Sequence, residues 1–225
     1  MEYLINLAIL FGIYSMLALS LNLVVGMSGL VSLAQAAFYG IGAYATAIGM
    51  TSLGLGFFTT ILLGMVINAL IAFVVGKILS RFQGDIYAIV SAGLSIIVFS
   101  ILLNWKSVTN GPLGIFGIGK PEIAGYAFYS NSAFLLLTLV FTLVIFAIYW
   151  WIDKSSFGRV LKALREDEKL TQIMGYKTKY YKSVIFVLSA AFTITAQYRR
   201  YLPSFLTYLL CIIFPDAMNM DFTGP

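Results

Sequence analysis

Long apolar stretches separated by short polar breaks dominate the hydrophobic pattern of this chain. The longest of them, residues 3–76, contains 74 residues without a single Asp, Glu, Lys or Arg. A helix that crosses a hydrocarbon layer of ~30 Å needs about 20 consecutive apolar residues. This stretch therefore has room for about three crossings, and the pattern predicts a membrane protein built from helices.

Glycine-rich and charged breaks divide the apolar pattern into six segments. The last segment holds only 16 uncharged residues before Arg199 and Arg200, so it is shorter than the other five. We predict an all-α fold, a polytopic transmembrane helical bundle of five to six spans in a single domain over residues 1–225. The predicted spans are residues 4–25, 30–50, 57–76, 86–105, 132–151 and 183–198.

Small residues crowd the second predicted span. Ala36 and Gly40 are four positions apart, as are Ala43 and Ala47. Small residues at this spacing let helix backbones approach closely in a membrane. We therefore expect the second span to lie inside the bundle.

Charge is scarce and clustered. Hydrophobic residues make up 60% of the chain and charged residues 10%, with a formal net charge of +5. Residues 153–182, called here the polar segment, carry eight basic and four acidic residues. Basic loops between spans face the cytoplasm, so we predict a cytoplasmic polar segment and an outer amino terminus. The same distribution, basic residues between apolar spans, argues against nucleic acid as a partner.

The residues that are missing exclude most catalytic chemistry. The chain has no histidine, and Cys211 is its only cysteine. A Ser-His-Asp triad, a histidine-ligated metal site and a Cys-x-x-Cys pair are therefore impossible. A membrane-embedded enzyme, the alternative of a different class, is disfavoured further because the spans lack paired aspartates. We predict no catalytic residue, no metal site and no enzymatic activity in this chain.

The polar segment also predicts a helix. Ser155 or Ser156 can cap its start, good helix formers fill about four turns, and Gly175 suits the position after its end. An interrupted apolar stripe beside the charges needs a partner surface. A solvated connector that lies on anionic lipid is the alternative.

Four blocks of sequence, in order, resemble a known family. They are LSLNLVVGMSGLVSLAQAAFYGIGAY (residues 19–44), GDIYAIV (84–90), NWKSVTNGPLGI (104–115) and GRVLKALREDEKLTQIMG (158–175). Together they resemble bacterial and archaeal branched-chain amino acid ABC transporter permeases of the LivM-like branch. The resemblance covers roughly residues 17–192.

The resemblance implies roles for particular residues. In that family the cytoplasmic segment docks on the ATPase subunits, which implies contacts or helix-shaping roles for Arg159, Ala163, Arg165, Glu166, Asp167, Glu168 and Gly175. Asn22 and Gln35 fall in the first block and are the candidates for a substrate pathway, because polar groups inside a membrane often mark one. Hydrogen bonding between helices is the alternative role of both.

The resemblance also implies a function. It is that of the membrane-spanning permease subunit of an ATP-driven ABC importer for branched-chain amino acids, in the inner or plasma membrane of a bacterium or archaeon. The implied partners are two ABC ATPase subunits, a second homologous permease and an extracytoplasmic substrate-binding protein. ATP and magnesium would be held by the ATPase subunits, and this chain needs no cofactor. A LivM-like permease for urea or short amides is the nearest alternative.

The carboxyl end departs from the family pattern. Relatives continue through further spans, whereas Pro203 and Pro215 flank an apolar run here that is too short to cross. We expect a truncated or frame-disrupted end after about residue 192. A non-functional truncated permease is therefore a further alternative.

Overall fold

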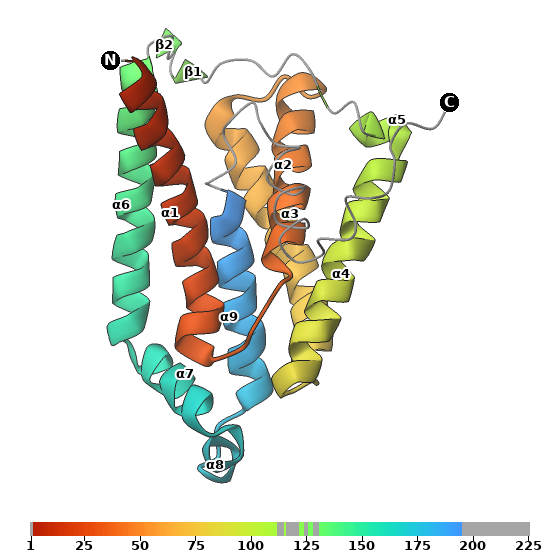
Figure 1. Ribbon diagram of the computed structural model, residues 1–225, viewed down its shortest axis with the longest axis vertical. Coiled ribbons are helices and arrows are strands. Elements are labelled where there is room, and N and C mark those ends of the chain that lie inside the picture. Colours follow the sequence, from red (N-terminus) through yellow and green to blue (C-terminus); the bar gives the residue numbers. More distant parts are fainter. Residues whose placement is uncertain (1, 112–114, 116–121, 124–125, 128–130, 195–225) are drawn as a thin grey trace.

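The chain folds as a bundle of helices (Figure 1). The computed structural model describes residues 2–111, 115, 122–123, 126–127 and 131–194. Apart from the two-residue strands β1 (Glu122–Ile123) and β2 (Tyr126–Ala127), which pair antiparallel, the regular structure in these ranges is helical. The predicted all-α transmembrane bundle is confirmed.

Longer helices form the bundle and short ones lie at its ends. The long helices are α1 (Glu2–Ser28), α2 (Gln35–Thr51), α3 (Phe57–Leu79), α4 (Gly84–Asn104), α6 (Asn131–Lys154) and α9 (Thr178–Thr193). The short helix α5 (Lys106–Thr109) lies at the end that holds the strands, and α7 (Ser156–Glu166) and α8 (Glu168–Ile173) lie at the opposite end (Figure 1).

Four of the long helices are long and apolar enough to span a membrane, namely α1, α3, α4 and α6. Helices suit a membrane because their backbone N–H and C=O groups form hydrogen bonds within the helix, where the hydrocarbon offers no partners. The shorter α2 and α9 have 17 and 16 residues, or about 26 and 24 Å at 1.5 Å per residue. Residues 195–198 of the sixth predicted span lie outside the described residues.

The second predicted span is corrected by the structure. Its helix begins at Gln35, five residues after the predicted start at Leu30. Gly29 adopts a left-handed φ of 69°, and residues 29–33 that follow α1 are not helical. Apolar residues alone could not reveal this break, because Leu30, Val31 and Leu33 suit a membrane helix.

Helix α4 supplies the polar partners for this connector. The Leu33 N–H donates to Ser91 Oγ at 3.0 Å, and Ser95 Oγ donates to the Leu33 carbonyl at 2.7 Å. Backbone outside a helix is tolerated at membrane depth only where it is buried in protein and bonded. Two serines inside an apolar helix thus have a structural role, which is to hold the residue 29–34 connector against α4.

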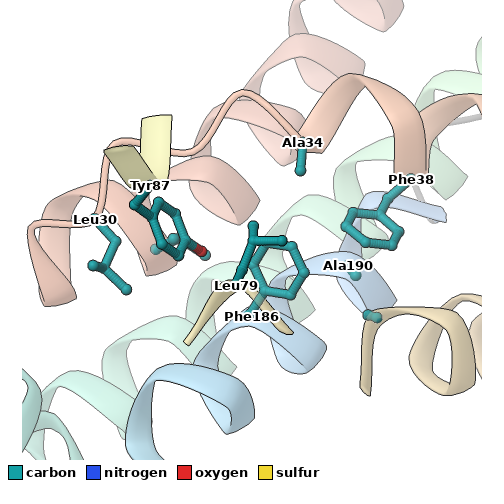
Figure 2. Close-up of a cluster of buried hydrophobic side chains, with 9 residues drawn as sticks. Leu30, Ala34, Phe38, Leu79, Tyr87, Phe186 and Ala190 are labelled. Atoms are coloured by element: carbon teal, nitrogen blue, oxygen red, sulfur yellow. The ribbon is translucent and has the colours of Figure 1, made fainter. Parts of the chain in front are cut away.

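The connector and five helices, α1, α2, α3, α4 and α9, enclose the main apolar core. It consists of Val24, Leu30, Ala34, Phe38, Ala72, Leu79, Tyr87, Phe186 and Ala190. Figure 2 shows several of these side chains gathered between α9 and its neighbours. Phe38 and Phe186 meet edge to face with ring centroids 5.2 Å apart, a favoured aromatic geometry.

Helix α9 is the central element of the bundle, because it packs against α1, α2 and α3. Close helix contact depends on small residues. A Cβ built on Gly12 would lie 2.7 Å from Thr138 Cγ2 of α6, and one on Gly49 would lie 2.6 Å from Thr60 Cγ2 of α3. Burial of Ala36, Gly40, Ala43 and Ala47 confirms that α2 lies inside the bundle.

The outer surface of the bundle is apolar. Phe11 of α1, Ile89 and Ile97 of α4 and Leu143 of α6 are all exposed. Lipid tails are as apolar as these side chains, so such a surface is stable in a bilayer. The end of the bundle that carries residues 77–85 and the polar segment is called here the basic end.

Candidate functional site

Helix α7 leaves α6 through a tight turn at Ser155. The Ser155 side chain accepts a hydrogen bond from the Gly158 N–H at 3.1 Å and so caps α7, which decides between the two predicted caps, Ser155 and Ser156. A Cβ on Gly158 would lie 2.3 Å from the Ile152 carbonyl oxygen. Only glycine allows the backbone at position 158 to lie this close to the Ile152 carbonyl. The turn that directs α7 across the basic end therefore depends on Gly158.

Helix α7 is attached to the bundle on its inner face. Leu161 packs in a buried cluster with Leu23, Met27, Ile152 and Ile185. Arg165 Nη1 donates to the Gly26 carbonyl oxygen of α1 at 2.8 Å. Apolar contacts and a charge-assisted hydrogen bond therefore hold α7 against the end of α1.

The predicted single helix over the polar segment is wrong, because the chain breaks between two helices at Asp167. This residue has φ −151° and ψ 112°, an extended conformation. Its Oδ1 accepts hydrogen bonds from Lys169 N at 2.8 Å and Leu170 N at 3.1 Å, which caps α8. The Asp167 side chain replaces backbone carbonyls as the acceptor for these N–H groups, so a new helix starts there. Helix propensity does not predict this outcome.

Helix α8 ends at Ile173, and Gly175 follows its end, as the sequence predicts. Gly175 has a φ of 89°. Its N–H donates to the Gln172 carbonyl at 2.9 Å, and the Tyr176 N–H donates to the Thr171 carbonyl at 3.3 Å. This pair of bonds is a Schellman motif, which favours glycine at the left-handed position. The chain reverses there, and α9 begins at Thr178 beside α8.

Helices α8 and α9 are joined by polar contacts. Lys182 Nζ lies 2.6 Å from Glu168 Oε2. Gln172 Nε2 donates to Thr178 Oγ1 at 3.0 Å. The lysine is only 2% exposed, and Thr178 is also buried. A partly buried ion pair therefore connects α8 to α9, the central helix of the bundle.

The outer face of α8 is apolar and uncovered. Leu170 is 52% exposed, Ile173 83% and Met174 65%. These three residues are called here the α8 tip. In Figure 1, α8 is the element farthest along the basic end. Exposed apolar side chains grouped on a polar segment are typical of a surface that binds another protein.

The predicted contact residues of the polar segment differ in what they touch. Arg159, Ala163 and Glu166 are exposed, and Arg159 Nη2 donates to its neighbour Ser156 Oγ at 2.9 Å. Arg165, Asp167 and Glu168 make intramolecular bonds to α1, α8 and α9 respectively. Their contact with an ATPase stays a prediction.

Gln35 lies in a polar cluster at the start of α2. Its Nε2 donates to Ser20 Oγ of α1 and to Thr193 Oγ1 of α9, and Ser189 Oγ donates to its Oε1 at 3.1 Å. The cluster joins three helices in the interior of the bundle. These bonds match the alternative role of Gln35 in interhelical bonding, and its place in a substrate pathway stays a prediction.

Asn22 lies elsewhere, at the outer seam between α1 and α6. Its Nδ2 donates to the Tyr149 hydroxyl at 3.0 Å, and its side chain is exposed. The structure therefore does not bring the two pathway candidates into one site. The pathway role of Asn22 also stays a prediction.

Sequence reasoning missed the partners in these contacts. Lys182 is one of the eight basic residues of the polar segment, and Ser189 and Thr193 fall within the predicted span of residues 183–198. The available signal was that both hydroxyl residues lie four positions apart on one helix face. No comparable signal marks Lys182, because its acidic partner lies across a chain reversal.

Comparison with known proteins identifies the family. The family model described as branched-chain amino acid transport system / permease component matches residues 3–196. The chain belongs to this permease family. The predicted resemblance to LivM-like permeases is thereby confirmed.

Individual relatives agree with this membership. The chain is 35% identical to the LivM permease proteins of Salmonella typhimurium and Escherichia coli, named as high-affinity branched-chain amino acid transport system permease proteins, over 84% of its length and 50% of theirs. It is 24% identical to BraD of Pseudomonas aeruginosa over 81% of its length and 64% of that protein. The chain thus spans about half the length of the LivM proteins. No solved structure matches the chain.

Proposed function

We propose that this chain is the membrane-spanning permease subunit of an ATP-driven importer of branched-chain amino acids. The substrate class comes from the LivM and BraD relatives, whose names state branched-chain amino acid transport. The observation that carries the proposal is the α8 tip, an exposed apolar surface on a polar segment that is fastened to the bundle. Such a surface fits a partner protein at the basic end.

The proposed partners follow from the family. A second homologous permease completes the transmembrane part, and an extracytoplasmic binding protein delivers the amino acid. Two ATPase subunits bind ATP and Mg²⁺ and contact the polar segment. This chain itself catalyses no reaction. The excess of basic residues in the polar segment supports a cytoplasmic basic end in the plasma membrane.

The proposed mechanism is rigid-body transmission. ATPase subunits that close on ATP displace the polar segment, and the attached helices follow. Packed helices respond to such a displacement by rotating or shifting as units, because their interfaces are closely packed. The attachment of α7 to α1 through Arg165 supports this route.

The test uses the full chain with the ATPase and permease subunits of its transport system, purified together. Replacing both Ile173 and Met174 by serine should weaken ATPase co-purification by about tenfold or more, since each buried apolar side chain contributes ~1.5–3 kcal/mol. Tyr180→Ser is the matched control, because Tyr180 is also exposed but lies on α9. Equal co-purification of the double variant and the control contradicts the α8 tip as the docking surface.

Substrate identity needs a second measurement. Proteoliposomes that contain the complete transporter and its binding protein should take up labelled leucine when ATP is supplied. Labelled urea serves as the competitor substrate. Uptake of urea without uptake of leucine contradicts the proposed substrate class and favours the amide alternative.

A further inference from the structure

Lys182 is a charged residue in an unusual place. It lies on α9, is 2% exposed, and has Glu168 as its ion-pair partner at 2.6 Å. The glutamate side chain is 18% exposed. Lysine is almost never fully buried unless it is paired. Removal of either partner would leave the other charge poorly solvated, so the two groups hold each other in place.

The pair matters because α8 has little else to hold it. Of the residues of α8, only Thr171 is buried, while Leu170 and Ile173 face outward. By contrast, α7 buries Leu161 and Leu164 against the bundle. Apolar packing and the Arg165 hydrogen bond therefore attach α7, whereas side-chain contacts of α8 to α9 are polar.

Those polar contacts all lead to the beginning of α9. Glu168 reaches Lys182, and Gln172 reaches Thr178. The Gln172 amide also lies 3.4 Å from Glu168 Oε1, at the outer limit of a hydrogen bond. The ion pair is the shortest and most buried of these side-chain contacts, and it adds to the covalent connection of residues 174–177 between α8 and α9.

Helix α9 continues from Lys182 into the centre of the bundle. Phe186 and Ala190 belong to the main core, and Ser189 bonds Ser20 of α1 and Gln35 of α2. A displacement of Glu168 that moves Lys182 therefore reaches three other helices through α9. Arg165 and Gly26 form a separate attachment, from α7 to α1.

We infer that Glu168 and Lys182 form a positioning pair that carries movement of the α8 tip into α9 during the transport cycle. This inference rests on the proposed function, in which the α8 tip contacts an ATPase. Neither residue contacts the substrate in this role. The pair transmits a displacement, and its loss should separate ATP hydrolysis from transport.

The experiment measures leucine transported per ATP hydrolysed by the complete transporter in proteoliposomes. The variants are Glu168→Gln, Lys182→Met and the charge swap that combines Glu168→Lys with Lys182→Glu. Lys77→Met is the matched control, since Lys77 is an exposed lysine on α3, outside the polar segment. Co-purification of the ATPase subunits is measured on every sample.

Both single variants should keep the ATPase subunits and lose at least about fivefold in the transport ratio, the low end of measured coupling between sites. The charge swap should recover most of the ratio, and Lys77→Met should leave it unchanged. A purely structural pair would lower the yield without changing the ratio. Single variants with the wild-type ratio, or a swap as poor as they are, overturn the inference.

If the variants do not fold, a measurement on the wild-type complex tests the inference instead. Hydrogen exchange of the amides in residues 168–173 and 178–183 is compared with ADP and with a non-hydrolysable ATP analogue. Protection should change together in both ranges. A change confined to residues 168–173 overturns the inference.

The two proposals can fail separately. A wild-type chain that does not co-purify with the ATPase subunits contradicts the proposed function and this inference with it. If the wild-type chain co-purifies with the ATPase subunits and the single variants keep the wild-type transport ratio, the positioning pair alone is contradicted.

Discussion

Arg165 Nη1 donates a hydrogen bond of 2.8 Å to the Gly26 carbonyl oxygen, from a position 139 residues further along the chain. The last carbonyls of a helix have no intrahelical partner and carry partial negative charge. The Arg165 guanidinium supplies a hydrogen-bond donor and a positive charge at this end of α1. The polar segment is therefore attached to α1 as well as to the helices that adjoin it in sequence.

Replacement of Arg165 by alanine should loosen this attachment. A hydrogen bond from a charged group contributes about 1.5–3 kcal/mol when buried, and because Arg165 is exposed we expect about 1 kcal/mol. Unfolding of the purified protein in mixed detergent micelles measures the change. Glu166→Ala, at an exposed neighbour, is the control, and equal stability of the two variants contradicts the bond's contribution.

Loss of the α8 cap should destabilise α8. Asp167→Ala removes the side-chain acceptor for Lys169 N and Leu170 N, which costs about 0.5–2 kcal/mol at a helix start. Asp167→Asn retains an acceptor oxygen and should lose much less. Hydrogen exchange of residues 168–173 reports the difference directly. Similar exchange in both variants shows that the cap is dispensable.

The residue 29–34 connector should depend on the two serines of α4. Ser91→Ala together with Ser95→Ala leaves the Leu33 N–H and carbonyl without these partners. An unsatisfied buried polar group costs about 1–3 kcal/mol, and we expect a loss in that range. Ser100→Ala, at an exposed position of the same helix, is the control. Thermal unfolding in detergent compares the variants.

Gln35 should stabilise the bundle more than Asn22 does. Gln35→Leu removes bonds to α1 and α9, and we expect a loss of about 2 kcal/mol, near the upper end for polar contacts between membrane helices. Asn22→Leu removes one bond to Tyr149 at the surface, with an expected loss of about 0.6 kcal/mol. Chemical unfolding of each variant gives the values. The reverse order contradicts the central position of the Gln35 cluster.

Leucine uptake by the same two variants addresses the pathway prediction. A substrate-pathway role for Gln35 or Asn22 requires loss of uptake in protein that is folded and still bound to the ATPase subunits. Wild-type uptake by either variant removes that residue from the pathway. Stability and uptake thus separate the two roles that polar residues have inside a membrane.

The sequence by itself determined the class of this protein. Apolar length predicts membrane helices because hydrocarbon admits few other backbones, and four ordered blocks predict the family. Local rules also predict a cap at Ser155 or Ser156 and a helix end before Gly175, since both depend on residues a few positions apart. These features need only neighbours in the chain.

Only the tertiary structure decided how the apolar and polar stretches are broken and joined. The α2 helix starts at Gln35 because Ser91 and Ser95 of α4 bond the preceding backbone, and the polar segment divides at Asp167 because the aspartate caps a new helix. Glu168 meets Lys182 only after the chain reverses between α8 and α9, and Arg165 meets Gly26 only after α7 has packed against the distant helix α1. The physical reason is that a hydrogen bond or ion pair depends on distance in space, which periodicity along the chain does not encode.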